Sequence, residues 1–189
     1  MVQYLQGKVR ITGGKWKGRK VTFFSLPGLR PTTNRIRETL FNWLLPYLKD
    51  SYCLDLFAGS GILGFEALSR GCAHNTFVDH SKIVIDTLKK NVEVLNTTNV
   101  AFVHGRFPYN IQKIRNSYFN IVFLDPPFYR GFINQVFPWL EKSNILTSRA
   151  YIYVEVEKNI PLLLPDNWES YRENKTHNLF YGLFFRYKK

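Results

Sequence analysis

Residues 53–64 read CLDLFAGSGILG, and this stretch decides the fold. An apolar run over 52–57 is typical of a buried strand, and Gly59, Gly61 and Gly64 after it complete a G-x-G-x-x-G pattern that leads into a helix. Glycine lets the backbone turn sharply and approach a ligand, and the helix N-terminus then faces that ligand's electron-rich groups. The stretch therefore predicts a Rossmann-like α/β fold.

The same alternation of strand and helix continues along the chain. Strands that are apolar almost throughout are typical of a parallel sheet covered on both faces. We predict a mostly parallel, twisted, seven-stranded sheet with helices on both faces, ending in an antiparallel strand pair. The predicted strands are 52–57, 76–79, 100–104, 119–124, 150–157, 167–174 and 178–187, and the predicted helices are 34–48, one directly after the glycines, 81–95 and 131–141.

Positive charge is concentrated near the N-terminus. The chain of 189 residues has 26 Lys and Arg against 14 Asp and Glu, a formal charge of +12, and residues 1–37 hold nine of the cations and no acid. Alternating apolar residues around 9–11 and 21–23 predict a small β-hairpin. We expect a basic hairpin extension over 1–33 and a Rossmann-like domain with its leading helix over 34–189.

Cations interleaved with an aromatic ring are typical of nucleic-acid binding, because Lys and Arg neutralise phosphates and an indole stacks on bases. A solvated basic face is the plain alternative, and a membrane surface is a weaker one because the segment does not form an amphipathic helix. The residues expected to contact nucleic acid here are Lys15, Trp16, Lys17, Arg19 and Lys20.

The composition excludes several classes of protein. A hydrophobic content of 45% supports a core, and no apolar run reaches the roughly 20 residues of a membrane span. Cys53 and Cys72 form no CxxC pair, so we expect reduced, buried thiols in a cytoplasmic protein. The four histidines show no ligand spacing, and we expect no metal and no membrane partner.

Two acids near strand ends bear on the cofactor. Asp79 ends the second strand, where a carboxylate can accept both hydroxyls of a ribose, as NAD and S-adenosylmethionine both require. Asp55 lies in an apolar run, and a buried carboxylate is costly unless a cation or several donors meet it. S-adenosylmethionine offers an ammonium group, whereas a pyrophosphate would be repelled. The alternative is that Asp55 only caps loop amides.

The sequence Asp125-Pro-Pro-Phe128 follows the apolar strand that ends at Leu124. Proline fixes the backbone, so the Asp125 carboxylate and the Pro126 carbonyl form a rigid pair of acceptors for an exocyclic amino group, with Phe128 stacking on its ring. Such a site would orient the amine toward a methyl donor. A simple turn with a surface phenylalanine is the alternative.

These motifs resemble a known family. VRITGGKWKGRK, RPTTNRIRETLFNWL, LDLFAGSGILGFEALSRG and NIVFLDPPF are similar, in the same order, to segments of the bacterial 16S rRNA (guanine(966)-N(2))-methyltransferases, which are class I enzymes dependent on S-adenosylmethionine. The resemblance implies methyl transfer from S-adenosylmethionine to the N2 amino group of a flipped-out guanine in 16S ribosomal RNA of the small subunit. It implies a cytoplasmic enzyme, and we expect a monomer.

The resemblance also implies roles for residues. The catalytic group would be Asp125, Pro126, Pro127 and Phe128. The cofactor-binding residues would be Asp55, Phe57, Gly59, Ser60, Gly61, Asp79, His80, Gly105, Arg106, Thr32 and Thr33. Arg30, Arg35 and Arg37 would lie beside the methionine end of the cofactor or the RNA, and the basic segment would hold the RNA backbone. From the residues themselves, Tyr129 and Arg130 continue the loop after Phe128 and are expected to contact the base or its phosphate, with a surface turn as the alternative.

The sequence departs from the family at two places, and other functions stay open. Asn34 stands where the family usually has Asp, and Arg106 ends a segment where an acid or amide commonly addresses adenine; a guanidinium cannot accept that hydrogen bond. The alternatives are methylation of DNA adenine or protein glutamine, an NAD oxidoreductase, and an RNA-binding module without catalysis.

Overall fold

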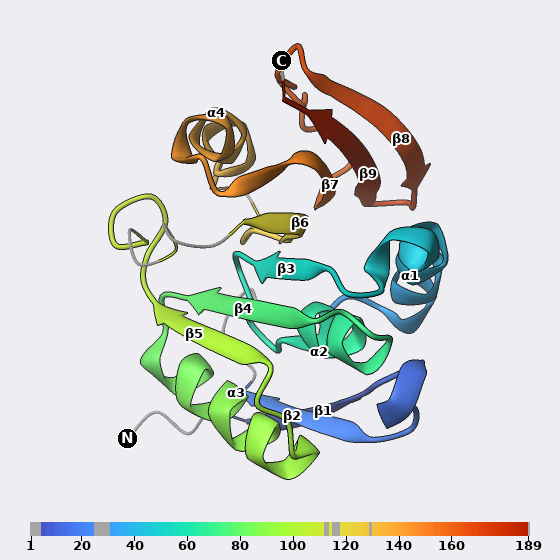
Figure 1. Cartoon of the computed structure of the whole chain (residues 1–189), viewed down its shortest axis with the longest axis vertical. Helices are drawn as coiled ribbons and strands as arrows, with labels where there is room; N and C mark the ends of the chain where they lie inside the picture. The colour runs from blue at the N-terminus through green and yellow to red at the C-terminus, as the bar shows by residue number, and fades with distance from the viewer. Residues whose placement is uncertain (1–4, 25–30, 112–113, 115–117, 129, 189) are drawn as a thin grey trace.

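The computed structural model describes residues 5–24, 31–111, 114, 118–128 and 130–188. One seven-stranded sheet runs through the molecule in the order β5-β4-β3-β6-β7-β9-β8 (Figure 1). The first five strands in that order are parallel, and β9 and β8 add an antiparallel pair, as predicted. The strands are β3 (Tyr52–Asp55), β4 (His74–Asp79), β5 (Val100–His104), β6 (Phe119–Leu124), β7 (Leu146–Glu157), β8 (Trp168–Lys175) and β9 (Leu179–Tyr187).

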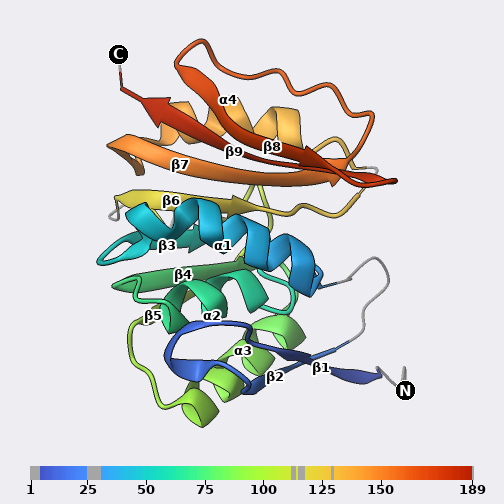
Figure 2. The same ribbon diagram turned by 90° about the vertical axis from the view of Figure 1, so that its right-hand side faces the viewer.

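Helices cover both faces of the sheet (Figure 2). Because successive side chains of a strand point to opposite faces, Cys53 and Phe123 pack into one core and Leu54 and Val122 into another. The first core lies under α1, α2 and α3, and the second lies under α4 and the loop after β5. The helices are α1 (Asn34–Leu48), α2 (Ile62–Ser69), α3 (Lys82–Leu95) and α4 (Ile133–Ser143).

Several predicted bounds agree with the structure and others do not. The predicted ranges of α1, β5 and β6 agree residue for residue. β3 ends at Asp55, two residues earlier than expected, because the chain turns there toward the glycines. β7 begins at Leu146, four residues earlier than expected, because Leu146 pairs with Phe119 of β6. Such pairing depends on neighbouring strands and leaves no local sequence signal.

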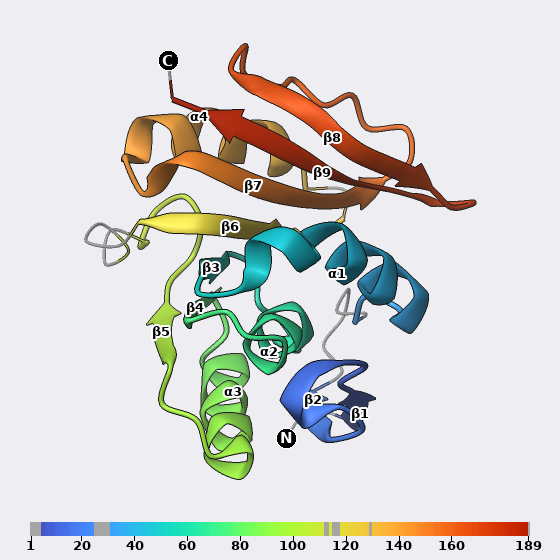
Figure 3. The same cartoon turned by 45° about the vertical axis from the view of Figure 1, so that its right-hand side comes forward.

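The basic segment forms the predicted hairpin from β1 (Gln6–Arg10) and β2 (Lys20–Phe24), with a 3₁₀ turn η1 (Gly14–Trp16) between them. The hairpin lies against α2 and α3 (Figure 3). Ile11 and Val21 are fully buried in the core under α1, α2 and α3. The hairpin thus shares its core with the sheet, and the domain boundary at residue 33 stays a prediction.

Hydrogen bonds fasten the hairpin to the helices. The Thr12 amide and hydroxyl donate to Glu66 Oε1 at 2.6 and 2.8 Å, and the Asn91 side chain exchanges two hydrogen bonds with the Thr22 backbone at 2.9 and 2.8 Å. Buried side chains that satisfy backbone groups in this way fix the position of the hairpin.

Two further properties concern the whole described chain. Cys53 and Cys72 are free and buried, as predicted. Across the described residues, the helices are too short or too polar to cross a bilayer.

Candidate active site

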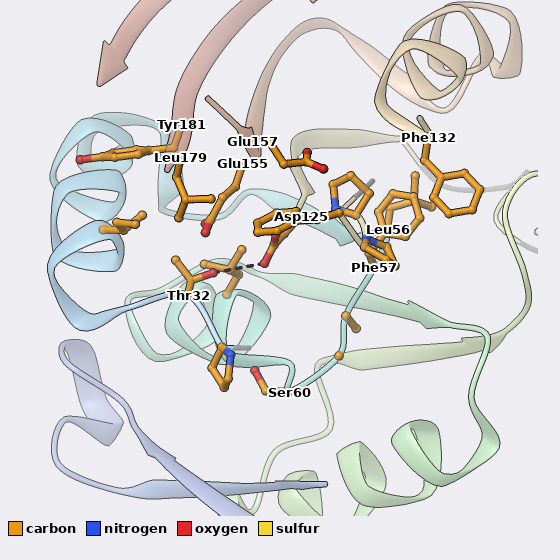
Figure 4. A pocket seen from close by; sticks show the side chains of 18 of the residues that line it. Thr32, Leu56, Phe57, Ser60, Asp125, Phe132, Glu155, Glu157, Leu179 and Tyr181 are labelled. Atoms are coloured by element: carbon orange, nitrogen blue, oxygen red, sulfur yellow. Dashed lines mark hydrogen bonds between the residues drawn. The ribbon is translucent and has the colours of Figure 1, made fainter. Parts of the chain in front are cut away.

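A cavity of about 1580 Å³ opens at the carboxyl edge of the parallel strands. Figure 4 shows that Asp125, Glu155 and Thr32 lie together in it, with Phe57 and Phe132 on one side and Leu179 and Tyr181 on the other. Ligands of open parallel sheets bind at this edge. The expected site residues that line the cavity are Thr32, Thr33, Arg35, Asp55, Phe57, Gly59, Ser60, Asp79, His80, Gly105, Arg106, Asp125, Pro126, Pro127, Phe128 and Arg130.

The glycine turn shapes the floor of the cavity. Gly59 and Gly61 have φ angles of 48° and 72°, in the left-handed region that favours glycine. Gly61 does not line the cavity; a Cβ added to it would lie 2.3 Å from Leu88 Cδ2. Gly61 therefore serves close packing of the turn on α3, while Gly59 and Ser60 present the backbone to the cavity.

Asp55 at the end of β3 is 3% exposed. It accepts one hydrogen bond from the Gly64 amide at 3.3 Å, which is the capping contact that the plain alternative anticipates. Burial, and the nearby charge of Asp79, outweigh that contact and raise the pKa of Asp55 to about 7. The negative charge of this carboxylate is therefore stabilised by too few donors and by no cation of the described residues, which favours a cationic ligand.

Asp79 at the end of β4 is held by two backbone amides. Its Oδ2 accepts from Gly59 at 3.0 Å and its Oδ1 from Ser81 at 2.8 Å, and His80 Nδ1 lies 3.3 Å from Oδ1. Each carboxylate oxygen has a second lone pair, so this fixed group can still accept hydroxyls. The Gly105 amide, just after β5, donates to the Asp79 backbone carbonyl at 3.0 Å, which fixes the start of the loop after β5 against the end of β4.

The Asp125-Pro-Pro-Phe segment begins directly after β6. Because β6 is the neighbour of β3, Asp125 and Asp55 extend from the same edge of the sheet. Asp125 is partly buried and accepts from the Thr32 hydroxyl at 3.4 Å, while Phe128 is 38% exposed. Burial, together with repulsion from Glu155 and Asp55, raises the pKa of Asp125. A rigid acceptor thus faces the cavity beside an exposed ring.

Three carboxylates on adjacent strands enter the cavity, Asp55 from β3, Asp125 from β6 and Glu155 from β7. None of them takes part in an ion pair among the described residues. No group of three or more acidic, His or Cys side chains in the described part of the chain has the geometry of a metal site. Three carboxylates at the strand ends without an ion-pair partner in the described chain fit S-adenosylmethionine, whose sulfonium and ammonium groups are both cationic.

The structure corrects two expectations about RNA contacts. Trp16 is 6% exposed and packs in the core, so its indole is not accessible to a base; Lys15 Nζ lies over its ring, 4.7 Å from the ring centroid. Arg37 is fully buried and pairs with Glu66, so it contacts neither RNA nor the cofactor. Both residues lie among cations in the sequence, which suggested solvent exposure.

The remaining expected RNA-binding residues fall into two groups. Lys15, Lys17, Arg19 and Lys20 are exposed but lie at the far ends of α2 and α3, away from the cavity; Arg19 Nη2 reaches the Val94 carbonyl at 2.5 Å. Arg35 and Arg130 are exposed at the cavity itself. Arg30 and Tyr129 lie outside the described residues.

Sequence reasoning missed Glu155. It was placed in a strand, but an acid within an apolar run is the same signal that singled out Asp55. Glu155 is 4% exposed, lines the cavity and accepts from the Tyr153 hydroxyl at 2.8 Å. The β8–β9 connection and the strand ends beside it, residues 174–179, were missed as well, since pairing of β9 with β7 brings them to the cavity.

Comparison with known proteins decides the family. Residues 9–184 match the family described as Conserved hypothetical protein 95. The chain belongs to this family. It is 45% identical over 183 residues to ribosomal RNA small subunit methyltransferase D of Escherichia coli, covering 95% of this chain and 91% of that protein. The corresponding protein of Haemophilus influenzae is 44% identical, with 95% and 94% covered. The resemblance inferred from the sequence motifs is confirmed.

Solved structures agree with the family assignment. The Escherichia coli protein YhhF, described as a candidate methyltransferase, superimposes with a TM-score of 0.86 at 42% identity, covering 97% of this chain and all of that one. A 16S rRNA N2 G1207 methyltransferase of Thermus thermophilus, solved with S-adenosylmethionine and guanosine, has a TM-score of 0.65 at 17% identity, with 98% of this chain and 51% of that one covered. That second likeness is one of fold alone.

Proposed function

We propose that this family member transfers a methyl group from S-adenosylmethionine to the N2 amino group of a guanine in 16S ribosomal RNA. The observation that carries the proposal is the convergence of the glycine turn after β3 and the Asp125-Pro-Pro-Phe segment after β6 on one cavity. The family and its named relatives support an rRNA methyltransferase.

Two parts of the cavity suit the two ends of the cofactor. Asp79 would accept the ribose hydroxyls beside the Gly59 backbone, and Phe57 would pack near the adenine. Asp55 would face the ammonium group, whose positive charge would stabilise the buried carboxylate. Thr32 and Thr33, just before α1, complete the wall on this side. When bound, S-adenosylmethionine supplies an electrophilic methyl group on its sulfonium.

Asp125 and Pro126 would act on the amine. An exocyclic amine of guanine is a weak nucleophile because its lone pair is delocalised into the ring. The Asp125 carboxylate and the Pro126 carbonyl would accept its two N–H bonds, which fixes its orientation and stabilises positive charge on nitrogen. Pro127 keeps the segment rigid, and Phe128 would stack on the base. No strong general base is needed, because the methylated nitrogen is acidic and loses its proton readily.

Reaching a base in this cavity requires that the guanine leave its stack. Arg35 and Arg130 lie at the cavity, where they would hold the phosphates beside the flipped nucleotide. We place the reaction on the small subunit in the cytoplasm and propose that the chain acts as a monomer.

Incorporation of a radiolabelled methyl group tests this function. The chain is incubated with labelled cofactor and with small subunits, naked 16S rRNA, duplex DNA and ribosomal protein, each from cells that lack the corresponding activity. We expect label in 16S rRNA, mapped to N2 of one guanine. Label in DNA adenine or in a protein glutamine would contradict the proposal, and so would failure to bind the cofactor.

Variants at Asp125 test the assigned role. Asp125→Ala should abolish transfer while cofactor binding, measured by calorimetry, persists. Asp86→Ala is a matched control, because Asp86 is half exposed on the outer side of α3 and pairs with Lys82. Full activity of Asp125→Ala would reject the assignment.

A further inference from the structure

Glu155 occupies a second acceptor position next to Asp125. In the register of β6 and β7, Leu124 lies opposite Val154, so Asp125 and Glu155 are neighbours at the edge of the sheet. Both side chains lie on the face that also carries Tyr153, and both enter the cavity (Figure 4). Adjacent strands are about 4.8 Å apart, so two carboxylates there address two neighbouring groups of one ligand.

The environment of Glu155 keeps it available as an acceptor. The Tyr153 hydroxyl donates to Oε2 at 2.8 Å, and the Thr32 hydroxyl, which donates to Asp125 at 3.4 Å, lies close enough to Glu155 to favour its ionised form. Burial raises the pKa of Glu155, and these two hydroxyl groups oppose that shift because they favour the ionised form. Glu155 is on the side of Asp125 away from β3 and Asp55, so it faces the substrate rather than the cofactor.

The Watson–Crick edge of guanine matches this arrangement. Guanine presents two adjacent donors, the N2 amino group and N1–H, whereas adenine and cytosine present an acceptor beside their amino group. A site built to accept N1–H leaves buried lone pairs facing each other when the ligand offers an acceptor there, which is strongly unfavourable. The position next to the amine-holding Asp125 therefore decides which amino-bearing base fits.

We propose that Glu155 accepts the N1–H of the target guanine while Asp125 and the Pro126 carbonyl hold its N2 amino group, which makes Glu155 the residue that selects guanine. The inference rests on the proposed function and adds the group that reads the base.

Binding of free nucleosides tests this without requiring catalysis. 2-Aminopurine riboside keeps the 2-amino group but carries an acceptor at N1, and its fluorescence reports binding directly; guanosine is measured by displacement. The wild-type chain, saturated with S-adenosylhomocysteine, should bind guanosine at least about 10-fold more tightly. In Glu155→Gln the amide can donate to N1 of 2-aminopurine, so the preference for guanosine should fall at least about 10-fold. 2-Aminopurine also lacks O6, but that difference is common to both proteins.

Matched variants complete the test. Glu157→Gln makes the same change two residues further along β7, at the same cavity, and should leave the preference unchanged. If Glu155→Gln does not fold, Tyr153→Phe removes one bond that holds the carboxylate and should weaken guanosine more than 2-aminopurine riboside. An unchanged preference in a folded Glu155→Gln overturns the inference while leaving methyl transfer intact. If the wild-type chain transfers no methyl group to rRNA, the proposed function itself is rejected.

Discussion

Arg37→Met tests how the hairpin, the segment before α1 and α2 are held together. The Arg37 guanidinium is fully buried and donates to the Thr32 and Arg10 carbonyls at 2.6 Å each. It also donates to Asn34 Oδ1 at 2.8 Å and pairs with Glu66 at 3.3 Å. Methionine fills most of the volume but removes all four donors.

The expected loss follows from those contacts. Each acceptor left without its donor costs about 1 kcal/mol, and removal of one partner of a buried ion pair costs about 3–5 kcal/mol in total. Glu66 keeps Thr12 and, at 3.1 Å, Arg70, which places the expected loss near the lower end, about 3 kcal/mol. For a domain of this size that lowers the Tm by roughly 6–12 °C.

Urea denaturation of the ligand-free chain measures the loss. Arg35→Met, two residues earlier on α1 and exposed, is the matched control and should change the free energy of unfolding by less than about 0.5 kcal/mol. The double variant Arg37→Met, Glu66→Gln should lose less than the sum of the two single variants, because both changes remove the same ion pair. A loss below about 1 kcal/mol, or one equal to that of the control, would refute the reasoning.

Three further predictions concern Asp55, Gly64 and the basic turn. The pKa of Asp55 is about 7 in the folded chain and near 4 when unfolded, so its ionisation destabilises the fold progressively from pH 4 to pH 7, by about 4 kcal/mol in all. The advantage of Asp55→Asn in urea unfolding should therefore grow over that range and level off above it, and a constant difference would contradict the assigned burial. Gly64→Ala should cost about 1–3 kcal/mol, because its Cβ would lie 2.4 Å from both Asn75 Nδ2 and Phe77 Cε1; combined with Asn75→Ala, the cost should be less than additive. Replacing the turn cations at 15, 17, 19 and 20 by Ala should make the slope of log affinity for 16S rRNA against log salt shallower by up to about 3, and an unchanged slope would exclude the turn from the RNA surface.

The sequence was sufficient where local patterns and the fold agree. Apolar residues at 36, 40, 44 and 48 repeat with the helical period, and α1 has the predicted bounds. The glycine turn and the Asp125 segment each mark a strand end, and parallel pairing then brings both to one edge. Asp55 was recognised because its charge conflicts with an apolar strand.

Other features depend on partners far away in the sequence. Arg37 looked like one more cation of a basic segment, but its counterion Glu66 is 29 residues further along the chain. Trp16 looked like a stacking ring, but η1 packs it against α2. The burial of Arg37 and of Trp16 leaves no periodic pattern in the sequence, because each residue is buried where the hairpin packs on helices that follow it in the chain.

If the basic turn at residues 15–20 contacts RNA, its placement at the far ends of α2 and α3 restricts which RNA can bind. Both helices begin at the cavity and end beside the basic turn, and α3 has 14 residues, which is about 21 Å of helix. An RNA strand that contacts both the basic turn and the cavity must bridge this span, because both lie on the same packed core. The chain would thus discriminate among guanines by the three-dimensional shape of the surrounding RNA, and a loop too tight or too open would present its backbone at the wrong separation.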